Sequence, residues 1–312
     1  MRGFLAATAV AALLSGCLSP LPKNNNPDIP QQQELSTTPF FPQTEFHCGP
    51  AALATAMGAE GDSTSPEILS EHLFIPSLEG SLQVEIMATS RRLGYIPVRL
   101  ESEIQALIDT VALGKPVLVL QNLATPGRPH WHYAVLIGYD ISNNKLVLRS
   151  GTERRKEMRL RTFLRTWNWA GRWAVILLQP GEMVDTIMQR DYFRALADLE
   201  QTDQLELTET AYEGALPYWP DSEFLWAGIG SIAYRQGQLE RSENALKTLL
   251  NFHPNSVTGR NNLASVLLDK GCTEQALDQI SRAEKLLSQD QRFIDMVNAT
   301  RQEISASISQ NG

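Results

Sequence analysis

Short apolar runs alternate with amphipathic stripes up to about residue 180, and a purely helical pattern follows. The runs Val117–Leu120 and Trp173–Leu178 read as buried strands. A helix is predicted through the i, i+3, i+4, i+7 stripe of Ile104, Leu107, Ile108 and Val111. The pattern therefore predicts an α+β domain over residues 40–180 and an all-α region over residues 186–312.

A further apolar strand is expected to begin at His132. We interpret Gly138-Tyr139-Asp140 as the turn that closes this strand, and Lys145–Arg149 as the hairpin strand that returns. The chain order is thus a helix first and a sheet afterwards, with a histidine at the start of one strand.

The first helix of the α+β domain is expected to begin near Cys48. Pro50 suits the first helical position, where its missing N–H costs nothing, and the Ala-rich stretch after it suits a buried helix. Unpaired N–H groups and the macrodipole at a helix N-terminus favour a thiolate. Cys48 is therefore a candidate nucleophile with a lowered pKa, and Gln43 is a candidate donor to a developing oxyanion.

The helical region repeats with a period of 34 residues. Pro220 and Pro254 are separated by this interval, as are Gly237 and Gly271. Small and apolar residues at helix contacts share it, and the period is typical of tetratricopeptide repeats. We expect three helix pairs and a capping helix from Asp290 onward, with a groove that binds a peptide or protein partner. The alternative is a platform that only stabilises the α+β domain.

The N-terminus has the pattern of an export signal. A positive start precedes the apolar run Phe4–Leu14, which is too short to span a bilayer. Leu14-Ser15-Gly16-Cys17 resembles a bacterial lipobox, which implies a signal peptide over residues 1–16 and lipid attachment to Cys17. An ordinary signal peptide or a simple N-terminal anchor are the alternatives.

The residues after Cys17 bear on localisation. Leu18 follows where an Asp would signal retention at the inner membrane, so we expect an outer-membrane lipoprotein that faces the periplasm. Residues 17–39 hold the lipidated cysteine and a stretch rich in Pro, Asn and Gln, which we interpret as a flexible tether.

Composition excludes some function classes. The chain has 312 residues, a formal net charge of −8 and a sequence pI of about 5.2. A nucleic-acid partner is disfavoured, because phosphate binding normally needs a clustered basic surface. Three cysteines cannot build a disulfide framework, and Cys272 is interpreted as a structural or surface thiol. We expect no cofactor.

The chemistry-bearing residues of the α+β domain carry a family resemblance. The segments Gln43-x4-Cys48-Gly49-Pro50-Ala51-Ala52-Leu53 and His132-x2-Val135-x2-Gly138-x-Asp140, with a Gly-Lys-Pro strand between them, resemble cysteine peptidase family thirty-nine. This family includes the peptidases that remove double-glycine bacteriocin leaders. The resemblance implies a papain-like fold and a peptide or protein substrate. It implies that Cys48 is the nucleophile, His132 the general base and acid, and Gln43 the oxyanion donor.

The sequence departs from this family at one position. The family places an Asp after the strand that follows the histidine, where the carboxylate orients the imidazole, but this chain has Ser150 there. A serine accepts a hydrogen bond from imidazole but brings no charge to stabilise imidazolium. Asp140 is a candidate substitute, and the third role stays open between these two residues.

Several readings compete with catalysis by Cys48 and His132. Cys48 is alternatively a buried structural thiol and His132 a core histidine. His47 and His130 are nearby candidates for the base, and a zinc site with these histidines is conceivable although no paired ligand motif supports it. At the level of function, the alternatives to an envelope-anchored peptidase are a non-catalytic peptide-binding relative and an amidase or transacylase.

Overall fold

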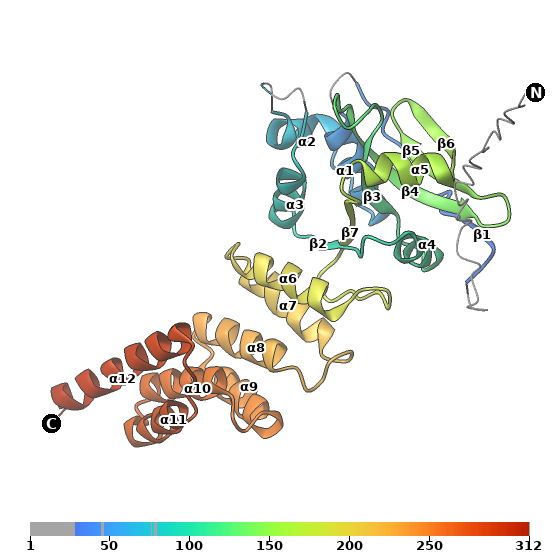
Figure 1. Cartoon of the computed structure of the whole chain (residues 1–312). Coiled ribbons are helices and arrows are strands. Elements are labelled where there is room, and N and C mark those ends of the chain that lie inside the picture. The colour runs from blue at the N-terminus through green and yellow to red at the C-terminus, as the bar shows by residue number, and fades with distance from the viewer. Residues whose placement is uncertain (1–28, 45–46, 76, 78–79, 312) are drawn as a thin grey trace, which may run out of the picture.

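The computed structural model describes residues 29–44, 47–75, 77 and 80–311 (Figure 1). The predicted signal peptide, Cys17 and the first part of the tether lie outside these residues. The sheet-bearing part contains β1 (Gln32–Glu34), α1 (Cys48–Ala59), α2 (Pro66–Leu73), α3 (Gln83–Arg92), β2 (Ile96–Arg99), α4 (Ile104–Ala112), β3 (Val117–Asn122), β4 (Trp131–Asp140), β5 (Lys145–Ser150), β6 (Glu153–Arg159), α5 (Leu160–Asn168) and β7 (Ala174–Leu178). The helical part contains α6 (Gln189–Glu200), α7 (Leu205–Ala215), α8 (Glu223–Arg235), α9 (Leu239–Phe252), α10 (Val257–Asp269), α11 (Thr273–Lys285) and α12 (Gln291–Asn311). The predicted α+β domain followed by an all-α region is confirmed.

One antiparallel sheet organises the first part of the chain, in the strand order β2-β7-β3-β4-β5-β6 with β1 paired to β4. Alternate residues of β3 enter two separate cores. Leu118 and Leu120 pack with Leu53 of α1, whereas Val117 and Val119 pack with α4 and α5. The sheet therefore has α1 on one face and α4 and α5 on the other.

Small residues let α1 lie close to its neighbours. The helix is buried from Gly49 to Met57, with Leu53 and Met57 fully covered. A Cβ atom on Gly49 would lie 2.5 Å from the Ser81 hydroxyl oxygen, so the residue after Cys48 has no room for a side chain. The N-terminus of α1 is thereby held tightly at its place on the sheet.

The predicted tether ends earlier than residue 39, because β1 lies within it. Residues 32–34 pair with 138–140 of β4, and the Leu35 amide donates to the Ile137 carbonyl oxygen at 2.8 Å. A Cβ atom on Gly138 would lie 2.7 Å from the Gln33 carbonyl oxygen. Gly138 thus allows the β1 backbone to pass close to β4.

The turn predicted at Gly138-Tyr139-Asp140 is also wrong, because these residues continue β4. The strand bulges between Leu136 and Gly138 and then pairs with both β1 and β5. The chain reverses after Asp140 instead, where Asn144 takes a positive φ of 51°. Residues 138–140 remain in the sheet because β1 pairs with them on one side and β5 on the other.

The 34-residue period is present in the helices themselves. The first helices of successive pairs begin at Gln189, Glu223 and Val257, and the second helices at residues 205, 239 and 273. The residue in the turn within each pair has a positive φ: 57° at Asp203, 74° at Gly237 and 76° at Gly271. The helix pairs therefore repeat in structure as well as in sequence.

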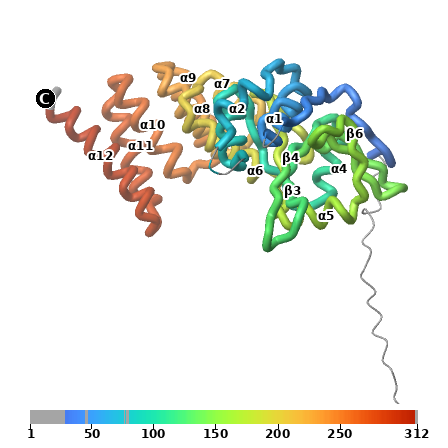
Figure 2. Tube along the Cα trace, turned by 90° about the horizontal axis from the view of Figure 1, so that it is seen from above, coloured from blue at the N-terminus to red at the C-terminus, as the bar shows by residue number. Residues whose placement is uncertain are grey.

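The first helix pair belongs to the same core as the sheet. Tyr192 and Leu196 of α6 and Tyr212 of α7 are fully buried in one cluster with Ile96 and Val98 of β2. The later helices have a core of their own (Leu249, Leu263, Ile280 and others) and continue away from the sheet (Figures 1 and 2). The boundary expected at residues 180–186 is thus crossed by continuous packing.

Within the described part of the chain, every helix is too short or too polar to cross a bilayer.

Candidate active site

Cys48 is the first residue of α1 and is half-buried at the edge of a small cavity. The cavity has a volume of about 10 Å³, which is about the space of one water molecule. It is lined by Phe40, Phe41, Gln43, Cys48, Ala51, Ala52, Thr55, Tyr133, Arg149, Ser150 and Gly151. The candidate nucleophile, the candidate oxyanion donor and the residue at the expected third position therefore share one cavity.

His132 is joined to this group through Ser150. Its Nε2 atom lies 2.8 Å from the Ser150 hydroxyl oxygen, and both residues are about 95% buried. Ser150 is the last residue of β5. The serine thus occupies the structural position in which the family resemblance places an orienting carboxylate.

The thiol lies beside the backbone of β4 rather than in direct contact with the imidazole. The backbone N–H of Tyr133 is hydrogen-bonded to the Cys48 thiol. Because side chains alternate along a strand, Tyr133 points towards α1 and His132 points to the opposite face of the sheet. On that face Gln121, which pairs with His132, is hydrogen-bonded to Thr166 of α5. Among the described residues, no hydrogen bond joins the thiol to the imidazole.

Burial keeps both groups in their neutral forms. It raises the pKa of the Cys48 thiol, and the backbone N–H groups of Tyr133, Gly49 and Cys48 oppose this rise only in part. Burial, with Lys156 and His130 acting in the same direction, lowers the pKa of His132 to about 4. The prediction of a thiolate with a lowered pKa is therefore not met in this structure.

Gln43 is positioned through its backbone. Its amide donates to the Gly151 carbonyl oxygen at 3.1 Å, immediately after Ser150. The first backbone N–H groups of α1, at Cys48 and Gly49, have no partner within the helix. A helix N-terminus and the Gln43 amide side chain at one cavity are the donors that an oxyanion needs.

Asp140 is wrong as a substitute third member. It lies at the opposite end of β4 from His132, where its carboxylate accepts from the amide and side chain of Asn143 at 2.9 and 2.7 Å. These bonds to Asn143 lower the pKa of the Asp140 carboxyl. Its role is in the β4–β5 turn.

The other two candidate bases, His47 and His130, are not among the residues that line the cavity. The His47 ring stacks on Phe74 with 4.9 Å between ring centroids, and its Nδ1 lies 3.2 Å from the Thr44 hydroxyl oxygen. His130 is exposed in the loop before β4. In the described ranges, no group of three or more His, Cys, Asp or Glu side chains is arranged to hold a metal ion.

Sequence reasoning missed two features of the cavity. Phe40 and Phe41 form part of its wall, although they follow directly on the predicted tether. Arg149 also lines it and is 5% exposed. The available signal for Arg149 was its place as a single charged residue at the end of the apolar run Leu146–Leu148.

One family model matches this part of the chain. Residues 35–175, somewhat less than half of the sequence, match the model of the Peptidase_C39 like family. The matched residues run from the end of β1 into β7 and include Gln43, Cys48, His132 and Ser150. No curated protein matches the chain.

Three solved structures each resemble less than half of the chain. A C39-like peptidase from Bacillus anthracis is 18% identical, with a TM-score of 0.39, 47% of this chain covered and 98% of that one. The peptidase domain of Streptococcus ComA is 22% identical, with a TM-score of 0.37 and 46% and 98% covered. The Yersinia enterocolitica type III secretion translocator chaperone SycD is 14% identical, with a TM-score of 0.38 and 42% and 90% covered.

Proposed function

We propose that this chain, whose residues 35–175 form a domain of the C39-like peptidase family, is a cysteine peptidase that hydrolyses a peptide bond through an acyl-enzyme on Cys48. One observation carries the proposal. Cys48 opens a buried helix in the cavity that also holds Gln43 and Ser150, and Ser150 is hydrogen-bonded to His132.

In the first step the thiol attacks the scissile carbonyl carbon. Both Cys48 and His132 are neutral in the resting site, so the proton leaves sulfur as the S–C bond forms. In the tautomer whose Nε2–H donates to Ser150, Nδ1 is free to receive this proton. The imidazole faces away from α1 in the structure, so the transfer requires the ring and the thiol to approach each other when substrate enters.

The remaining steps use the same groups. The negative charge on the former carbonyl oxygen is stabilised by the Cys48 backbone N–H and the Gln43 side chain. His132 then gives its proton to the leaving amine, which departs and leaves the thioester. Water attacks the thioester with His132 as base, the acid is released and Cys48 regains its proton.

A non-catalytic peptide-binding protein is the second candidate. It is favoured by Ser150, because a hydroxyl does not stabilise imidazolium as a carboxylate does. The pKa values of Cys48 and His132 agree with this reading, since both favour uncharged groups. In that case the cleft binds peptides without cleaving them.

The decisive experiment compares two cysteine variants. Purified protein is incubated with a quenched fluorescent peptide library, and the products are identified by mass spectrometry. Cys48→Ala is expected to abolish cleavage, while Cys272→Ala, at the other half-buried free thiol of the described residues, retains it. Binding of library peptides by the wild type without any cleavage that depends on Cys48 would leave only the second candidate.

We extend the proposal to the cell envelope. The lipobox-like segment before Cys17 supports lipid attachment, and Leu18 supports an outer-membrane location facing the periplasm. Several acyl chains would hold the protein stably on a bilayer. Metabolic labelling with a radioactive fatty acid should mark the full chain and fail with Cys17→Ser; labelling that persists in this variant would contradict lipidation.

The later helix pairs are proposed to bind substrate or a partner protein. Buried residues of α6, α7 and α8, with Ala245 of α9, belong to the core shared with β2, whereas the buried residues of α10 and α11 belong to the second core. Cross-linking of Cys48→Ala to bound library peptides, with mapping of the linked residues, tests this division. Links to α8–α11 support a binding groove, and links confined to the Cys48 cavity oppose it.

A further inference from the structure

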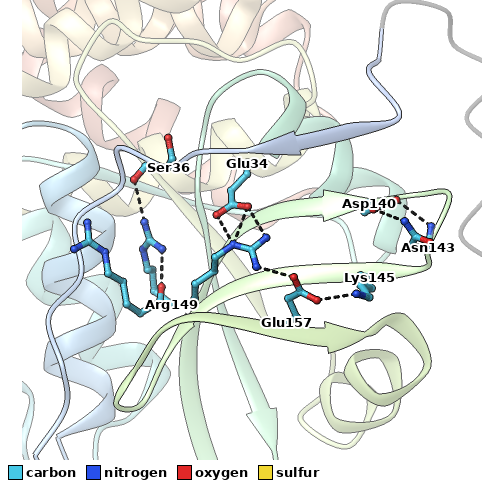
Figure 3. A network of polar contacts seen from close by, with 9 residues as sticks. Glu34, Ser36, Asp140, Asn143, Lys145, Arg149 and Glu157 are labelled. Atoms are coloured by element: carbon cyan, nitrogen blue, oxygen red, sulfur yellow. Dashed lines mark hydrogen bonds and ion pairs between the residues drawn. The ribbon is translucent and has the colours of Figure 1, made fainter.

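Arg149 is a buried cation with an unusual set of partners. Its guanidinium donates from Nε and Nη2 to the Thr38 carbonyl oxygen at 3.2 and 2.8 Å. Nη2 also donates to the Ser36 carbonyl oxygen at 3.1 Å, as Figure 3 shows. Nη1 donates to the Arg154 carbonyl oxygen at 2.5 Å. All three guanidinium nitrogens are therefore used on backbone oxygens.

The segment that Arg149 holds continues into the cavity wall. We call residues 36–43 the strap. Thr38 of the strap is 3% exposed. Phe40, Phe41 and Gln43 line the cavity beside Cys48. Arg149 fixes the beginning of the strap, and the bond from the Gln43 amide to Gly151 fixes its end.

Three consecutive residues at the end of β5 thus organise the site. Arg149 binds the strap, Ser150 binds His132, and the Gly151 carbonyl oxygen accepts from Gln43. A shift of the strap moves Gln43 relative to Cys48, because Gln43 ends the strap and lines the same cavity as the thiol. The geometry couples the position of the oxyanion donor to Arg149.

Only an arginine suits this position. Its planar fork reaches three carbonyl oxygens that come from different parts of the chain, whereas the single ammonium of lysine cannot span them. In the described residues no carboxylate is hydrogen-bonded to this guanidinium. Burial lowers its pKa, with the charge of Arg154 adding to the effect and Glu34 opposing it. Because the hydrogen bonds of this buried guanidinium all go to backbone carbonyl oxygens, two of them in the strap, we infer that its role is to hold the strap.

We propose that Arg149 is a positioning residue that fixes the strap and thereby places Gln43 at the oxyanion of the Cys48 reaction. The role in the reaction rests on the proposed function, whereas the strap contact does not depend on it. Arg149 touches no reacting atom in this scheme and acts through Gln43.

The first test follows the strap directly. Amide hydrogen exchange of residues 36–43 is compared among wild type, Arg149→Met and Arg155→Met. Arg155 is the matched control, because it bonds to Glu34 just before the strap but on the exposed surface. Exchange in the strap is expected to rise about tenfold or more in Arg149→Met and to stay unchanged in Arg155→Met. Unchanged exchange in Arg149→Met overturns the proposal.

The second test is a double-mutant cycle with hydrolysis of p-nitrophenyl acetate, corrected for the rate of Cys48→Ala. Arg149→Met should lower kcat by about 30-fold with KM within about twofold, since loss of an oxyanion donor costs 10²–10³ in kcat. In the Gln43→Ala background the same substitution should cost less than about twofold. An equal loss in both backgrounds contradicts action through Gln43.

Further variants and controls distinguish failure of the Arg149 proposal from failure of the proposed function. Arg149→Lys keeps the charge without the fork and should resemble Arg149→Met in kcat; full activity of the lysine variant opposes the proposal. Near-ultraviolet circular dichroism verifies folding, and the lysine variant takes over both tests if the methionine variant does not fold. If wild type shows no hydrolysis that depends on Cys48, the proposed function fails, and hydrogen exchange alone decides whether Arg149 fixes the strap.

Discussion

The imidazole of His132 is hydrogen-bonded to the hydroxyl of Ser150, with 2.8 Å between Nε2 and Oγ. A hydroxyl holds the ring in place but does not compensate a positive charge on it. The ionisable groups that act on the ring, Lys156 and His130, lower its pKa and so oppose a positive charge on it. This pair therefore orients the candidate base while leaving it weak.

Ser150→Asp should strengthen catalysis. A carboxylate in the position of the hydroxyl raises the pKa of His132 and stabilises imidazolium, because a charge-assisted bond is stronger than a neutral one. We expect kcat for p-nitrophenyl acetate to rise about tenfold, which corresponds to about 1.4 kcal/mol.

Ser150→Ala is the matched control for that change. It removes the bond to Nε2 and should lower kcat about tenfold, since a buried nitrogen loses its partner. A rate for Ser150→Asp at or below that of Ser150→Ala would show that charge at this position does not limit the reaction.

The reactivity of Cys48 should increase with pH. Burial raises its pKa, so alkylation by iodoacetamide is expected to have a midpoint above the ordinary thiol value of about 8.5. Mass spectrometry of the labelled peptides follows this cysteine alone. A rate that is already maximal at pH 6 would instead show a thiolate–imidazolium pair.

Acid should destabilise the folded chain through His132. Its pKa is about 4 in the folded state and 6.5 ordinarily, so the unfolded chain binds the extra proton between these values. The free energy of unfolding then falls with falling pH, by up to about 3 kcal/mol, and the loss is complete near pH 4. Urea unfolding at pH 7 and pH 4 measures this difference, and His132→Gln should reduce it; an unchanged difference would assign the acid sensitivity to other groups.

Gly138→Ala should destabilise the sheet by about 1–3 kcal/mol. The added methyl group meets the Gln33 carbonyl oxygen at 2.7 Å, so β1 must move away from β4. Gly127→Ala is the control, because a Cβ atom there meets nothing within 4 Å. Urea unfolding of both variants decides the point, and equal midpoints would mean that β1 adjusts at no cost.

The sequence was sufficient for elements whose residues alternate or repeat regularly. The helix at Ile104, the strand at Val117 and the 34-residue helix spacing all follow from local patterns, and the structure contains them. Pro50 also predicted a helix start near Cys48, and α1 does begin there, although Pro50 is its third residue and not its first.

The remaining features depend on contacts between distant segments. β1 is a polar strand of three residues that is defined by pairing with β4 and not by its own pattern. The sequence of the strap does not distinguish it from the tether, because the strap is held by hydrogen bonds from Arg149, a distant residue, to its backbone carbonyl oxygens. The predicted charge of Cys48 was wrong for the same reason. Its position at a helix N-terminus favours a thiolate, but the burial that opposes ionisation arises only in the folded chain.

The direction of β4 sets how the domain would stand on a membrane. Residue 32 pairs with Asp140 at one end of this strand, and His132 lies near the other end. The strand has 10 residues, so about 30 Å separate its two ends. With a lipid at Cys17, as proposed, the chain enters the sheet at the end remote from the catalytic groups. The tether would then join the domain at the end of β4 opposite His132, and would leave the approach to the catalytic groups unobstructed by its own attachment point.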